Sequence, residues 1–152
     1  MGIFYHFGYR VNTSDSFPTG IWKIDEKKNY KLGDIVVFCP VDSPVIRLGR
    51  KYSYLPWSLV CDSNVSPMIK SIAGFSGDKA KTNDNFITIN DMTTEFVEID
   101  PHGREIKLTK NLLVPPFHFW AFSNGKYGFD SRYFGPVSIK SIIGKVHLVL
   151  YL

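Results

Sequence analysis

Short apolar segments separated by turn residues constrain the fold of this chain more than any other feature. One segment, 43–52, predicts a helix, because Asp42 or Ser43 can cap it and Pro44 suits its first turn. The other apolar segments are rich in β-branched and aromatic residues, which favour a pleated surface. These segments cover residues 20–24, 34–39, 67–75, 85–89, 94–99, 117–122 and 145–152. The sequence therefore predicts a mostly β fold with one short helix.

The length and the apolar content indicate a single folding unit. A chain of 152 residues with 44% hydrophobic residues can bury a sizeable core, so we expect one domain over residues 1–152. Between Asp78 and Pro116 the chain becomes more polar and contains the turn-forming stretches "KTNDN", "NDMTT" and "DPHGRE". We therefore expect residues 79–114 to form a small, hairpin-rich insertion on the β core.

Charge and cysteine spacing exclude several classes of function. The net charge of +4 permits an acidic partner, but no basic run with interleaved aromatic residues forms a stacking platform, so no nucleic-acid partner is expected. Cys39 and Cys61 form no C-x-x-C pair and the four histidines are isolated, so neither a metal nor another cofactor is expected. No apolar stretch reaches the roughly 18 to 20 residues of a spanning helix. The opening stretch "GIFYHFGYRV" lacks the features of a signal peptide and is typical of a chain from which an upstream part was removed.

A serine and a lysine are the candidate catalytic residues. Ser16 lies in "NTSDSFPTGIW", residues 12–22, where neighbouring Pro and Gly by themselves indicate a surface turn. Lys70 lies in a strand segment and shares a face with Met68 and Ile72, so it is either an edge-strand lysine that reaches water or a buried amine. Burial would bring the pKa of the lysine toward roughly 7 to 8, where a neutral amine can take a proton from a serine hydroxyl. Lys70 is thus the partner that Ser16 would require.

Four segments, taken in order, resemble a known family of peptidases. They are "SDSFPTGIW" (14–22), "GDIVVFCP" (33–40), "MIKSIAGFSGD" (68–78) and "FDSRYFGPV" (129–137). Together they are similar to the serine/lysine type I signal peptidases, in particular the TraF-type conjugative transfer peptidases, and the resemblance extends from Asn12 to Leu148. It implies an antiparallel β core, Ser16 as the nucleophile and Lys70 as the general base.

The resemblance also implies roles for the residues around the nucleophile. The Ser16 backbone N–H and the Ser14 hydroxyl would bind the oxyanion of the tetrahedral intermediate, although Ser14 fits a simple turn equally well. Pro18 and Gly20 would hold the loop rigidly and so present Ser16 to the substrate.

The segment "FDSRYFGPV" implies a charge pair close to the lysine. In the TraF-type branch the residue matching Asp130 is counted with the catalytic residues, but a carboxylate that touches Lys70 would raise the pKa of the amine. We therefore expect Asp130 to pair with Arg132 and to act through it and the backbone. Many signal peptidases carry a lysine-orienting serine where this chain has Gly128. Another group, Ser131 or water, is expected to hold Lys70.

The cellular location that the resemblance implies leads to two further expectations. The active site would face the membrane on the periplasmic side of the bacterial inner membrane, and the family's anchor helix is missing from this chain. In that oxidising compartment Cys39 and Cys61 would form a disulfide, with two buried free thiols as the alternative. Phe17 and Trp22 would rest against the bilayer, where aromatic side chains are favoured.

The function implied by the resemblance is that of a membrane-associated serine endopeptidase. Its partners would be the membrane surface and an exported precursor, a conjugative pilin, from which it removes a leader or pro-segment. Two alternatives stay open. One is a pilin transpeptidase or cyclase that uses the same acyl-enzyme. The other is a non-catalytic binding module of a pilus or secretion complex, in which Ser16 and Lys70 are structural.

Overall fold

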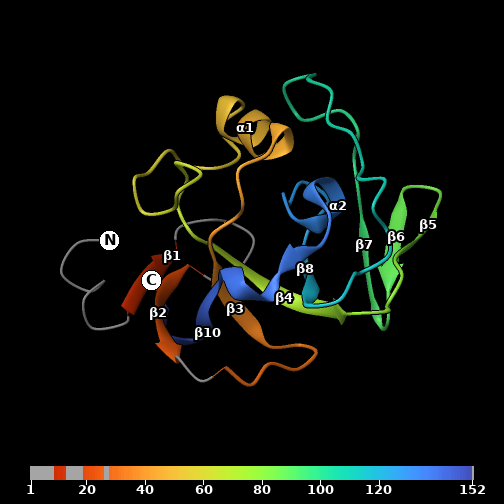
Figure 1. The fold of residues 1–152 in the computed structure, drawn as a ribbon. Helices are drawn as coiled ribbons and strands as arrows, with labels where there is room; N and C mark the ends of the chain where they lie inside the picture. Colours follow the sequence, from red (N-terminus) through yellow and green to blue (C-terminus); the bar gives the residue numbers. More distant parts are fainter. Residues whose placement is uncertain (1–8, 13–18, 26–27, 152) are drawn as a thin grey trace.

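A seven-stranded antiparallel sheet forms the main layer of the structure (Figure 1). The computed structural model describes residues 9–12, 19–25 and 28–151. Within them the strand order is β1-β2-β10-β3-β4-β8-β9, and every neighbouring pair is antiparallel. The predicted mostly β fold is confirmed. The strands are β1 (Tyr9–Asn12), β2 (Gly20–Asp25), β3 (Ile35–Phe38), β4 (Met68–Phe75), β8 (His118–Phe122), β9 (Val137–Ser138) and β10 (Ile142–Tyr151).

A small second sheet lies at the opposite end of the molecule from β1 and β2 (Figure 1). Its strands are β5 (Lys81–Asn83), β6 (Phe86–Ile89) and β7 (Met92–Glu95), and they pair in that order. Both connections are tight turns that contain Asp84 or Asn90, each with φ of 52°. Asp and Asn tolerate this left-handed conformation better than most side chains, which is why they suit short hairpin turns.

The strand predicted over 94–99 is displaced in the structure, because β7 ends at Glu95. The backbone of Val97 instead pairs with a side chain: its N–H donates to the Tyr133 hydroxyl at 3.0 Å, and that hydroxyl donates to the Val97 carbonyl at 2.8 Å. A distant phenol therefore satisfies backbone groups that would otherwise require a neighbouring strand.

The predicted helix over 43–52 is confirmed as α1 (Pro44–Lys51). Ser43 is its N-cap, and the Ser43 hydroxyl accepts a hydrogen bond from the Ile46 N–H at 3.2 Å. The expectation of a single helix is wrong, because the described residues also form α2 (Ser131–Phe134) and the 3₁₀ helix η2 (Ile139–Ser141). Both are too short to produce the periodic apolar pattern by which a helix is recognised.

Three apolar clusters hold the elements together. The largest contains Phe38, Met68 and Phe119 and packs against residues of α1 and α2. A second cluster joins the two sheets, because Ile87 and Ile89 of β6 pack with residues of β4 and β8. The clusters include alternate residues of β4, whose two faces are therefore both covered.

The third cluster contains Trp22, together with Ile24, Val37 and Val146. Only 2% of Trp22 is exposed, so the expectation that this side chain rests against a bilayer is wrong. Its indole lies in the core because β2 is an inner strand, paired with β1 on one side and β10 on the other. Phe17, the other residue of that expectation, lies outside the described residues.

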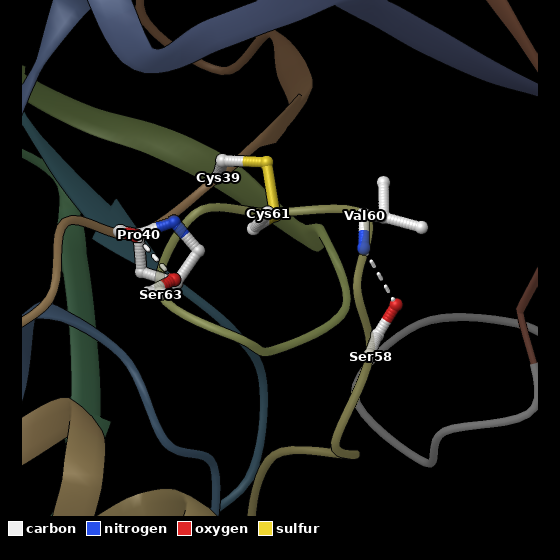
Figure 2. The surroundings of a disulfide bond; sticks show 6 residues. All are labelled: Cys39, Pro40, Ser58, Val60, Cys61 and Ser63. Carbon is white, nitrogen blue, oxygen red and sulfur yellow. Dashed lines mark hydrogen bonds between the residues drawn. A yellow bond between two sulfur atoms is a disulfide. The ribbon is translucent and has the colours of Figure 1, made fainter.

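A disulfide ties the loop after α1 to the end of β3. Cys39 and Cys61 are joined with an S–S distance of 2.07 Å and a Cα–Cα distance of 5.5 Å (Figure 2). Beside the bond, the Ser63 hydroxyl donates to the Pro40 carbonyl at 2.7 Å. The two connections attach the loop to the chain just after β3, which pairs with β4.

Removing this disulfide is expected to lower stability. The bond closes a loop with a sequence separation of 22 residues. A loop of that size corresponds to about 3 kcal/mol of unfolding free energy in the chain-entropy model. Urea unfolding of the protein before and after reduction measures the difference, and intact mass after alkylation counts the free thiols. Two alkylated cysteines in non-reduced protein exported to the periplasm would contradict the bond.

Candidate functional site

Lys70 is a buried amine at the centre of the main sheet. It lies in β4, between β3 and β8, with Val36 as its partner on β3. Met68 and Ile72, which share its face, are both buried, and only 5% of Lys70 is exposed. Of the two readings that the sequence left open, the edge-strand lysine is therefore excluded.

Burial is the main reason for a strongly perturbed titration of this amine. Desolvation lowers the pKa of Lys70 to about 8 from an ordinary value of 10.5. The negative charge of Asp130 acts in the opposite direction, and the positive charge of Arg132 lowers the pKa further. A substantial neutral fraction near physiological pH is what a general base requires.

Asp130 and Arg132 form an ion pair that is closed to solvent on both sides. Arg132 Nε lies 2.8 Å from Asp130 Oδ1, and Arg132 Nη2 lies 2.9 Å from Asp130 Oδ2. Asp130 is also the N-cap of α2 and accepts from the Arg132 backbone N–H at 3.0 Å. Arg132 Nη1 donates to the backbone carbonyls of Glu95 and Gly125 at 2.6 and 2.9 Å. The pair therefore joins α2 to the end of β7 and to the loop after β8.

Two buried serines occupy different places around this pair. The Ser123 hydroxyl donates to Asp130 Oδ2 at 3.1 Å, and the Ser123 N–H donates to the same oxygen at 2.8 Å. Ser131 points elsewhere, since its hydroxyl accepts from the Ala121 N–H at 2.8 Å. The expectation that Ser131 holds Lys70 is therefore not met in this structure, because α2 directs that hydroxyl to the backbone of β8.

Position 128 has no room for a side chain. A Cβ on Gly128 would collide with Ser123 Oγ and with Arg132 Nη2. The space that a serine at this position would need is filled by the Ser123 hydroxyl and the Arg132 guanidinium. Glycine at this position is thus a consequence of how the ion pair and Ser123 are packed.

The expected nucleophile, Ser16, lies in a segment that the structure does not describe, residues 13–18. Ser14, Ser16 and Pro18 lie outside the described residues. Asn12, directly before this segment, pairs with Gly20, shortly after it. A Cβ on Gly20 would collide with the Leu150 carbonyl of β10, so the close approach of the two backbones requires glycine there.

Two further observations concern metal binding and membrane-spanning helices. Among the residues that the structure describes, no group of three His, Cys, Asp or Glu side chains converges on a metal site. In the same part of the chain, none of the helices is both long and apolar enough to cross a bilayer.

Ser123 is the site residue that the sequence reasoning missed. It directly follows the apolar segment 117–122, whose strand was predicted correctly as β8. The sequence feature that could have indicated it is a serine at the end of a predicted buried strand. Whether such a serine lies near Lys70 depends on which strand pairs with β8, and the sequence does not show this pairing.

Loss of the buried ion pair is expected to be strongly destabilising. Asp130→Ala leaves the Arg132 guanidinium buried without its partner, which costs about 3 to 5 kcal/mol of unfolding free energy. Asp42→Ala is the matched control, because Asp42 pairs with Arg47 at 3.6 Å with both side chains 56% exposed. Such a surface pair contributes less than about 1 kcal/mol. Urea unfolding compares the two variants, and equal losses would contradict the role assigned to the buried pair.

Comparisons with known proteins identify several relatives that are named as conjugal or plasmid transfer proteins. The conjugal transfer protein TraF of Agrobacterium tumefaciens (strain 15955) is 32% identical over 134 residues, covering 86% of this chain and 75% of that protein. The probable conjugal transfer protein TraF of Sinorhizobium fredii is 30% identical over 149 residues, 94% of this chain and 77% of that protein. A plasmid transfer protein TraF of Escherichia coli is 26% identical over 164 residues, 98% and 86% of the two chains.

A solved structure and a family model also match. The crystal structure of a signal peptidase I from Enterococcus faecalis V583 aligns with a TM-score of 0.44 and 18% identity, covering 80% of this chain and 97% of that one. The model of the family described as signal peptidase, peptidase S26, matches residues 3–151. Since that match covers almost the whole sequence, the chain belongs to the S26 signal peptidase family, as its four sequence segments predicted.

Proposed function

We propose that this chain is a serine endopeptidase that uses Ser16 as its nucleophile and Lys70 as its general base. The observation that carries the proposal is the burial of the Lys70 amine at the centre of the sheet. Membership of the S26 family supports a serine peptidase that acts on an exported precursor. The names of the TraF relatives support a role in conjugation, and the substrate we propose is a conjugative pilin precursor.

The proposed acylation step transfers one proton and forms one bond. The neutral Lys70 amine takes the proton of the Ser16 hydroxyl as the oxygen attacks the scissile carbonyl carbon. The Ser16 N–H and the Ser14 hydroxyl stabilise the oxyanion of the tetrahedral intermediate. When the intermediate collapses, the Lys70 ammonium returns the proton to the leaving amine, and the acyl group stays on Ser16.

The acyl-enzyme is then resolved by a second nucleophile. In hydrolysis, Lys70 takes a proton from a water molecule as the water attacks, and the fragment held on Ser16 is released with a new carboxylate. Attack by an amine of the substrate itself would give a cyclic product instead. That product is lighter by one water than the linear product cut at the same bonds, so intact mass separates the two reactions.

The surroundings of the reaction follow from the same proposal. We place the active site at the membrane surface on the periplasmic side, consistent with a family that is periplasmic or membrane-associated. The Cys39–Cys61 disulfide fits that oxidising compartment. Small residues are expected before the scissile bond, because a shallow pocket rejects larger ones by steric clash.

The Ser/Lys pair is expected to behave as one catalytic unit. Ser16→Ala and Lys70→Ala should each abolish precursor processing, and the double variant should be no worse than either single one, because each residue is useless without the other. The measurement is co-expression with candidate pilin precursors, followed by intact-mass analysis. Asp42→Ala, which removes an exposed carboxylate that pairs with Arg47 on the surface, is the control that should process normally. Full processing by Lys70→Ala would eliminate the proposed dyad.

The pH dependence of the reaction should report the titration of Lys70. Because burial lowers the pKa of the amine to about 8, kcat/KM should rise roughly tenfold per pH unit below that value and level off above it. A lysine with an ordinary pKa would give a rise that continues toward pH 10.5. The measurement is the pH profile of processing of a purified precursor.

Stability provides the control for this prediction, because the same proton also affects folding. The folded state has the lower lysine pKa, so between pH 8 and 10.5 it binds fewer protons than the unfolded state, and the wild type gains stability as the pH rises. Relative to Lys70→Met, which lacks the amine, the gain should approach about 3 kcal/mol, from about 1.4 kcal/mol for each unit of pKa difference. Parallel stability curves for the two proteins across this window would contradict a depressed pKa.

A further inference from the structure

We propose that Ser123 is the positioning residue of the site and that its hydroxyl orients the Lys70 amine by accepting a hydrogen bond from it. The proposal rests on the proposed role of Lys70 as general base. Ser123 lies outside the four segments by which the family was recognised in the sequence.

Strand pairing brings the two residues together. In the antiparallel pair β4–β8, Ser71 lies opposite Phe122. Because the strands are antiparallel, one step further in this register leads to Lys70 in β4 and to Ser123, the residue directly after β8. Both therefore leave the sheet on the same face, one step beyond the last paired residues. Side chains directly opposite each other in this way have Cβ atoms about 5 Å apart.

The hydrogen bonds of Ser123 determine which way its hydroxyl faces. Asp130 is an ionised partner of Arg132, so its oxygens only accept, and the Ser123 hydroxyl must donate its single proton to Asp130 Oδ2. The lone pairs of Ser123 Oγ are then available to accept. Lys70 has N–H groups to donate and, at 5% exposure, little water around it.

We expect the contact in solution whether or not a substrate is bound. Among the described residues no hydrogen bond to the Lys70 amine is formed in this structure. Hydrogen bonds of catalytic groups are often long or poorly aligned in structures without substrate, and the geometry seen here is compatible with the contact. An N–H held by Ser123 Oγ leaves the nitrogen lone pair in a defined direction, which a base needs in order to take a proton from a fixed hydroxyl.

The same arrangement keeps a carboxylate close to the lysine without direct contact. Asp130 is bound by Arg132 on one side and by Ser123 on the other. Ser123 would thus connect Lys70 to Asp130 through a neutral group. The packing around Gly128 supports this arrangement, because a side chain there would displace the Ser123 hydroxyl.

The direct test is the titration of Lys70 in the intact protein. In ¹³C-lysine NMR spectra, with the signal assigned by Lys70→Arg, Ser123→Ala should lower the apparent pKa of Lys70 by roughly half a unit or more, because the charged amine loses an acceptor. Asp130 and Arg132 are the charged groups that act on Lys70, and both are retained in the variant. An unchanged or raised midpoint in Ser123→Ala would overturn the proposal.

Two controls separate this role from general structural support. Ser63→Ala also removes a buried hydroxyl with one hydrogen bond, to Pro40, and should leave the titration of Lys70 unchanged. Ser131→Ala tests the competing serine beside Asp130. A shift in Ser131→Ala without one in Ser123→Ala would overturn the proposal in favour of Ser131. If Ser123→Ala does not fold, Ser123→Cys keeps the shape with a weak acceptor and should shift the midpoint in the same direction.

Kinetics give an independent readout of the same contact. Ser123→Ala should lower kcat for precursor cleavage by roughly tenfold or more while KM changes less than about threefold, since the base and not the substrate is misoriented. If the wild type cleaves no precursor, the proposed function fails, and the NMR titration still decides the contact. If the wild type cleaves and Ser123→Ala matches it in both kcat and titration, only the role of Ser123 fails.

Discussion

The Asp130–Arg132 ion pair holds together parts of the chain that are far apart in sequence. Burying two charges is unfavourable unless their remaining hydrogen-bonding groups are satisfied. Here the carboxylate accepts from Ser123 and from three nitrogens of Arg132, and the guanidinium also reaches the carbonyls of Glu95 and Gly125. Each of these partners must be in place for the pair to be tolerated. The end of β7, the loop after β8 and the start of α2 are therefore positioned as one unit.

The two members of the ion pair have opposite effects on the pKa of Lys70, the candidate base. Asp130 raises and Arg132 lowers the pKa of Lys70, so burial between β3 and β8 remains the dominant influence. An isolated carboxylate at the same place would have kept the lysine protonated. Pairing the carboxylate with an arginine allows an acidic residue to organise the site while the amine remains able to act as a base near neutral pH.

Local sequence preferences account for most of the predicted elements. Segments rich in β-branched and aromatic residues predicted β2, β3, β4 and β8, and the Ser43-Pro44 step predicted the start of α1. The prediction was wrong for 94–99, because the Tyr133 phenol binds the backbone of Val97 in place of a strand. It also missed α2, a four-residue helix whose cap depends on a buried ion pair. At 94–99 a long-range contact outweighed local preference, whereas α2 is too short to show a periodic pattern.

The sequence by itself determined the strand-rich class, the family and the chemical types of Lys70, Asp130 and Arg132, since these follow from residue identity and spacing. It did not decide whether Lys70 is at an edge or in the centre of a sheet, because an alternating pattern is the same in both. Nor did it decide which serine lies opposite the lysine. Only the tertiary structure paired Ser71 with Phe122, a register that continues to Lys70 and Ser123, and left Gly128 no room for a side chain, because strand order and register depend on contacts between distant segments.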